Sequence, residues 1–68
     1  RRDEDGVTTS AEARNLLQTA LGHERATAGF YRQLARTAHL PALRTAFGRL
    51  AEEEEEHVRT LEDWLGAG

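Results

Sequence analysis

Residues 37–43, TAHLPAL, decide the fold of this chain of 68 amino acids. Pro41 disfavours helical geometry at Leu40 and fits the first turn of a new helix, so a tight connection stands directly before it. No proline precedes Pro41, and the helix-favouring residues alanine, leucine, arginine and glutamine dominate residues 11–38. Two long helices joined by so short a link form an antiparallel hairpin, and the predicted fold class is therefore all-α.

The ends of the two helices are marked by local signals. Thr9-Ser10-Ala11-Glu12 fits a capping box, in which a hydroxyl and a glutamate bond the first free amides, so the first helix is predicted at about residues 10–38. The second is predicted at about residues 41–65, because Gly66-Ala67-Gly68 ends it. We expect residues 1–8, which are charged and lack periodicity, to form a flexible arm before the hairpin of residues 9–68.

Composition limits the partners and the kinds of site that the chain can have. With a net charge of −3 it lacks the basic face that nucleic acid requires, and it has no apolar run long enough to cross a membrane. It has no cysteine, so a metal site must use histidine and carboxylate ligands, which suit iron, manganese or zinc. A chain this short buries too little surface to be comfortably stable alone, and we expect a cytoplasmic protein that forms oligomers.

Both predicted helices carry a heptad seam in which carboxylates or a histidine take the place of apolar residues. The seam of the first helix consists of Leu17, Leu21, Glu24, Ala28, Tyr31, Ala35 and Ala38. The seam of the second helix consists of Leu43, Phe47, Leu50, Glu54, His57, Leu61 and Trp64. Helical phase divides the remaining glutamates of the acidic run: Glu53 lies at the border of the seam, and Glu52, Glu55 and Glu56 face solvent.

A metal ion would compensate the cost of placing ionised side chains in an apolar seam. Glu54 and His57 are one turn apart on one face, and Glu24 lies about as far before the link as Glu54 lies after it. Di-iron carboxylate bundles use one glutamate from each of two helices and Glu-x-x-His from each of the other two. One hairpin supplies half of this ligand set, so we predict that two chains pair into a four-helix bundle around a di-iron centre.

Residues 11–65 resemble the encapsulated ferritins of the ferritin-like superfamily, whose chains look like half of a ferritin or rubrerythrin bundle. The likeness is carried by these positions: Glu24, Phe30-Tyr31, Pro41-Ala42-Leu43, Glu53 to His57, and Leu61 to Leu65. The resemblance implies that Glu24, Glu54 and His57 are catalytic residues and ligands of iron, and it favours iron over manganese. It also implies that the Tyr31 hydroxyl bonds a ligand histidine.

The chain departs from that family where Phe30 replaces a usual tryptophan, and where His23 and Ala26 replace acidic residues of an outer iron-access site. His23, at the edge of the first seam, and Glu53 are candidates for an outer metal contact. Both positions also fit an ordinary surface role.

The function that the resemblance implies is that of a ferroxidase, which oxidises Fe(II) for iron storage and detoxification. It implies a homodimer through the metal site, a higher-order ring of dimers, and enclosure by an encapsulin shell protein in a cytoplasmic compartment. Two alternatives stay open. One is a peroxide reductase similar to rubrerythrin, and the other is a metal-free helical hairpin that serves dimerisation or scaffolding.

Overall fold

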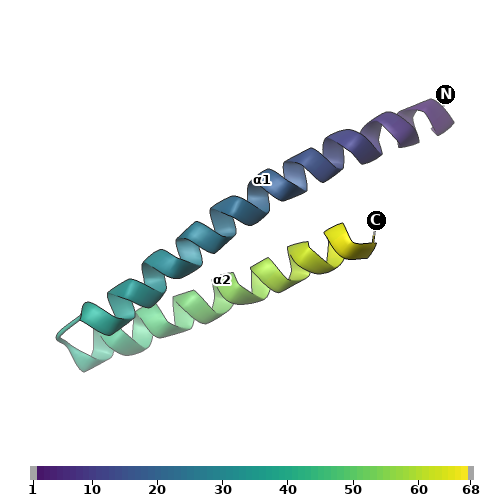
Figure 1. The fold of residues 1–68 in the computed structure, drawn as a ribbon. Coiled ribbons are helices and arrows are strands. Elements are labelled where there is room, and N and C mark those ends of the chain that lie inside the picture. The colour runs from purple at the N-terminus through teal and green to yellow at the C-terminus, as the bar shows by residue number, and fades with distance from the viewer. Residues whose placement is uncertain (1, 68) are drawn as a thin grey trace.

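The structure is a computed structural model that describes the backbone of residues 2–67 and the side chains of residues 11–66. It consists of two helices, α1 (Arg2–Thr37) and α2 (Pro41–Ala67), which pack against each other as an antiparallel hairpin. Figure 1 shows the two helices side by side, with α1 extending beyond the far end of α2. The predicted all-α hairpin is confirmed.

The link between the helices begins and ends where Pro41 predicts. The Leu40 carbonyl accepts hydrogen bonds from the amides of Leu43 and Arg44, both at 3.0 Å, and so starts the first turn of α2. The Arg44 Nε also donates to the Ala38 carbonyl at 2.9 Å. This guanidinium satisfies a carbonyl that the end of α1 would otherwise leave without a helical partner.

Helix α1 begins earlier than the capping box predicts, at Arg2 instead of at about residue 10. No proline interrupts residues 2–10, and a single glycine in a helix costs only about 1 kcal/mol, so nothing forces the helix to start later. The expected flexibility of residues 1–8 concerns motion and stays a prediction, and Arg1 lies outside the described residues. Helix α2 ends at Ala67, close to its predicted end.

The contact between the helices is narrow and is made of small side chains. Among residues 11–66, the buried apolar residues are Leu21, Ala28 and Ala51, which are 8%, 6% and 0% exposed. Alanines let the two helix backbones approach closely but contribute little apolar volume. The hairpin is also elongated, with a radius of gyration of 16.3 Å, whereas a compact chain of this length has about 11 Å.

Much of the predicted seam of α2 lies outside the contact with α1. Leu43, Leu50 and Trp64 are 44%, 37% and 57% exposed, whereas Ala51 and Val58 on the neighbouring stripe are buried and half-buried. The physical reason is that α2 has apolar side chains on two adjacent stripes, and α1 covers only one of them.

The uncovered side chains form a second surface, which we call the apolar face. It consists of Leu16 and Phe30 of α1, which are 70% and 60% exposed, and of Leu43, Leu50 and Trp64 of α2. At about 100° per residue, these residues lie on one side of the hairpin. None of the described helices is long and apolar enough to cross a membrane.

Candidate metal centre

Three side chains of the ligand type meet between the two helices, and they are the three that the seam predicts. Glu24 comes from α1, and Glu54 and His57 come from successive turns of α2. One ligand atom from each lies within 4.8 Å of the others. Glu24 meets Glu54 because both are nearly equally far from the link, and His57 follows Glu54 on the same face of its helix.

The cluster lies at the edge of the contact between the helices. His57 Nδ1 is 3.6 Å from Glu24 Oε1 and 3.5 Å from Glu54 Oε1. The side chains of Glu24 and Glu54 are 31% and 23% exposed, whereas that of His57 is 61% exposed. The hairpin therefore covers the cluster on one side and leaves His57 open on the side of the apolar face.

The surroundings of Glu54 shift the pKa of its carboxyl group. A hydrogen bond with the Glu24 side chain raises the pKa of the Glu54 carboxyl, and partial burial and the negative charge of Glu24 raise it further. His57 acts in the opposite direction, by hydrogen bonding and by charge, and lowers this pKa less than the other causes raise it. The net effect of these neighbours is to raise the pKa of the Glu54 carboxyl.

The cluster fits a metal ion by its donor atoms and by its unsatisfied group. Glu24 Oε1 is buried and has no hydrogen-bond partner among the described residues, which is costly for a carboxylate oxygen. Ligand atoms about 2.2 Å from one metal lie at most about 4.4 Å apart, so the observed spread needs only a small side-chain adjustment. Two carboxylates and one imidazole suit iron, manganese or zinc.

A hollow of about 250 Å³ adjoins the cluster on its open side. Its walls are Ala20, Glu24, His57, Thr60, Leu61 and Trp64. Two of the candidate ligands thus border a space that leads from the cluster toward the apolar face.

Tyr31 is half-buried and packs with other rings. Its ring stacks on Phe47 with the ring centres 6.3 Å apart, and it also contacts Phe30 at 5.8 Å. None of the hydrogen bonds found among residues 11–66 involves the Tyr31 hydroxyl. The hydrogen bond to a ligand histidine that the resemblance implies therefore stays a prediction.

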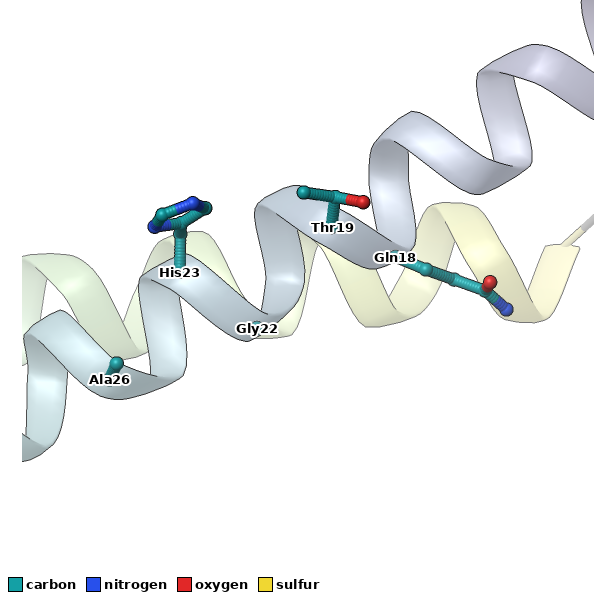
Figure 2. A pocket seen from close by; sticks show the side chains of 5 residues that line it. All are labelled: Gln18, Thr19, Gly22, His23 and Ala26. Carbon is teal, nitrogen blue, oxygen red and sulfur yellow. The ribbon is translucent and has the colours of Figure 1, made fainter.

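The two candidates for an outer contact lie outside the cluster. Glu53 is exposed on α2, and His23 is exposed on α1. Figure 2 shows His23 beside a shallow hollow whose other walls, Gln18, Thr19, Gly22 and Ala26, all belong to α1. A role for either residue in iron access stays a prediction.

Two ion pairs cross between the helices on the side opposite the apolar face. Arg32 donates from Nη2 to Glu55 Oε1 at 2.8 Å and from Nε to Glu55 Oε2 at 3.3 Å. Arg25 Nη2 donates to Glu62 Oε2 at 2.7 Å. The expectation that Glu55 only faces solvent is therefore wrong, because it is half-buried against Arg32. The sequence contains a signal for these ion pairs, because Arg25 and Arg32 are one heptad apart and so are Glu55 and Glu62.

Comparison with known families agrees with this geometry. A family model described as Rubrerythrin matches residues 15–68. No match was found among curated proteins or among solved structures. The matched range contains all three residues of the cluster, the link and the whole of α2.

Proposed function

The chain belongs to the rubrerythrin family, and we propose that it is a ferroxidase in which two copies of the hairpin bind and oxidise Fe(II) between them. Membership of this family indicates a ferritin-like protein with a di-iron centre and points to oxidoreductase chemistry. The observation that carries the finer proposal is the meeting of Glu24, Glu54 and His57 on the open side of the hairpin.

A second copy is the partner that this surface fits. The apolar face has five large apolar side chains that are each more than a third exposed. Exposed apolar patches of this kind mark interaction sites. A copy related by a two-fold axis would bring the same face, and with it a second set of two carboxylates and one imidazole.

The paired ligand set matches two iron ions in number and charge. Two copies supply four glutamates and two histidines, which is the pattern of carboxylate-bridged di-iron bundles. Four carboxylates balance two ferrous ions, and their negative charge favours the more highly charged ferric product. In this assembly Glu24 and Glu54 would hold Fe(II) by oxygen and His57 by nitrogen.

Fe(II) is the substrate, and the electrons balance with either of two oxidants. Two Fe(II) ions give up one electron each. With two protons, those two electrons reduce dioxygen to hydrogen peroxide, or reduce hydrogen peroxide to two water molecules. The protein residues bind and position the ions, and no side chain needs to act as a nucleophile.

Two hairpins enclose no space in which oxidised iron could be stored. We therefore infer that the product passes to a larger container, for storage and detoxification of iron. The resemblance to encapsulated ferritins supports a ring of dimers within an encapsulin compartment, with the encapsulin shell protein as the partner.

The test follows the growth of ferric absorbance in air after Fe(II) is added to the protein. We expect Glu24→Ala, Glu54→Ala and His57→Ala each to lower the rate at least about tenfold. Glu52→Ala is the matched control, because it removes an exposed carboxylate of the same acidic run outside the cluster. If all three cluster variants oxidise Fe(II) as fast as the wild type, this site is not the catalyst.

The family match also favours a second candidate, a peroxide reductase that uses the same site. In that case iron stays bound and an external reductant supplies the electrons. Consumption of many equivalents of hydrogen peroxide per chain, with a reductant present and no added Fe(II), would select this reading. Consumption only in proportion to added Fe(II) would select the ferroxidase.

A further inference from the structure

The three candidate ligands come from two helices, so their meeting depends on how α1 and α2 are aligned along their length. Sliding one helix by a single residue would displace its side chains by about 1.5 Å. Distances between a metal and its ligands vary by only about 0.2 Å. The alignment of Glu24 with Glu54 and His57 must therefore be held more tightly than the fold alone requires.

Apolar packing holds this alignment only weakly. Of the residues with described side chains, just Leu21, Ala28 and Ala51 are buried apolar residues. An alanine offers one methyl group, which interlocks with a facing helix far less than a leucine does. The axial register near the ligands needs a further constraint.

The ion pairs Arg25–Glu62 and Arg32–Glu55 are placed to supply it. The arginines are one heptad apart and so are the glutamates, in the opposite order that antiparallel helices require. Arg25 is next to Glu24 in the chain, and Glu55 is next to Glu54. The pairs thus tie together the two short segments that carry the carboxylates of the cluster.

Both pairs run diagonally between the helices. The contact of Tyr31 with Phe47 marks one level, which puts Arg32 level with Ala46, nine residues or about 13 Å before Glu55. Side chains of a helix lean toward its N-terminus, so Arg32 leans away from the link and Glu55 leans toward it. A diagonal contact changes its length when helices slide, whereas a contact at right angles to the axis hardly does.

We propose that Arg32 and Arg25 are positioning residues, whose diagonal ion pairs with glutamates of α2 hold the register at which the three candidate ligands meet. This inference rests on the proposed metal site. Ion pairs this exposed contribute little to folding stability, so their removal affects the ligands more than the fold. Arg32 has the larger effect because it makes two hydrogen bonds to one carboxylate.

If Arg32 acted on the metal site only through its charge, its replacement would change the affinity for Fe(II) in the opposite direction. Replacing Arg32 with glutamine removes a positive charge from the neighbourhood of a cation site, which by charge alone tightens metal binding. Loss of the register weakens it. The direction of the change therefore separates positioning from electrostatics.

The experiment measures Fe(II) binding without oxygen, by titration calorimetry, to the wild type, Arg32→Gln, Glu55→Gln and the exchanged pair Arg32→Glu with Glu55→Arg. We expect each single variant to bind up to about fivefold more weakly, which is the most that an exposed ion pair can contribute, and the exchanged pair to recover most of the affinity. Arg44→Gln is the control, since it also loses one positive charge and a hydrogen bond, but at the link. Its affinity should equal that of the wild type, and helix content by circular dichroism should match in all variants.

Two results would overturn the positioning role. One is an Arg32→Gln variant that binds Fe(II) as tightly as the wild type or more tightly, which leaves the proposed function intact. The other result is needed only if the wild type binds no Fe(II), which would refute the proposed function and leave the positioning role to be tested without metal. The register is then read in metal-free protein from nuclear Overhauser effects between the Tyr31 and Phe47 rings. Their loss in Arg32→Gln supports the alignment role, and their retention rejects it.

Discussion

Glu24 and Glu54 reach from different helices to the same nitrogen of His57, at 3.6 Å and 3.5 Å, and the neighbouring Glu24 side chain raises the pKa of the Glu54 carboxyl above its ordinary value of 4.5. At pH values between the ordinary and the raised pKa, the Glu54 carboxyl keeps its proton in the folded chain and has lost it in the unfolded chain. The protonated Glu54 carboxyl therefore stabilises the metal-free fold at low pH. This stabilisation disappears as the pH rises through the raised pKa of the folded state.

The first prediction compares the metal-free wild type with Glu54→Gln, whose amide resembles a protonated carboxyl and cannot ionise. At about pH 4 we expect the two proteins to have similar thermal midpoints. As the pH rises to about 8, the midpoint of the wild type should fall progressively below that of the variant. Unfolding followed by circular dichroism with a chelator present measures this. Glu56→Gln, at an exposed position, is the control. A constant difference between the wild type and Glu54→Gln at every pH would contradict the raised pKa of Glu54.

The double variant Glu24→Leu with Glu54→Leu should separate stability from metal binding. Without metal we expect it to be more stable than the wild type, because it removes two partly buried carboxylates that repel each other. Fe(II) at about one hundred times its dissociation constant should stabilise the wild type by about 2.7 kcal/mol and leave the double variant unchanged. Anaerobic thermal unfolding with and without Fe(II) is the measurement. A wild type indifferent to Fe(II) would favour a metal-free scaffold.

Charge on the apolar face should separate the proposed pair of hairpins. We expect Leu50→Glu to shift the protein toward single chains, because it puts a carboxylate on a surface that the partner would cover. Analytical ultracentrifugation gives the mass, and emission from Trp64, the single tryptophan of the chain and 57% exposed in one hairpin, should move to longer wavelength on separation. Gln33→Glu, at an exposed position of α1 outside the apolar face, is the matched control. Equal mass for the wild type and Leu50→Glu would argue against this face.

The close approach of the helices at Ala51 predicts that the stability of the hairpin is sensitive to the size of this side chain. Ala51→Leu should destabilise the hairpin by about 1–3 kcal/mol, because the 0% exposed methyl group leaves no room for a larger side chain. Ala26→Leu, the same change at an exposed position of α1, should stay within about 0.5 kcal/mol. Urea unfolding measures both. Similar effects for the two variants would mean that the helices do not meet at Ala51.

The hairpin and the meeting of the three candidate ligands could be predicted from sequence because they depend on strong local rules. Pro41 fixes the link, and equal distances from the link bring Glu24 to the level of Glu54. In α1 the predicted seam holds, since Leu21 and Ala28 are its buried residues.

The face of α2 that meets α1 could not be predicted in the same way. Leu50 and Trp64 are larger apolar residues than Ala51 and Val58, yet the smaller pair is the more buried. A helix with apolar residues on two neighbouring stripes gives no local sign of which neighbour each stripe meets. Which glutamate of the acidic run Arg32 meets depends on the same choice of phase.

The incomplete surroundings of His57, which is 61% exposed in one hairpin, have a kinetic consequence. In the proposed assembly a lone chain is inert, and competent sites form only by encounter. At high dilution the initial rate of iron oxidation should then rise with the square of the protein concentration, and it should become proportional once all chains are paired. Redox activity would thus begin only where the chain accumulates, without any separate activating signal.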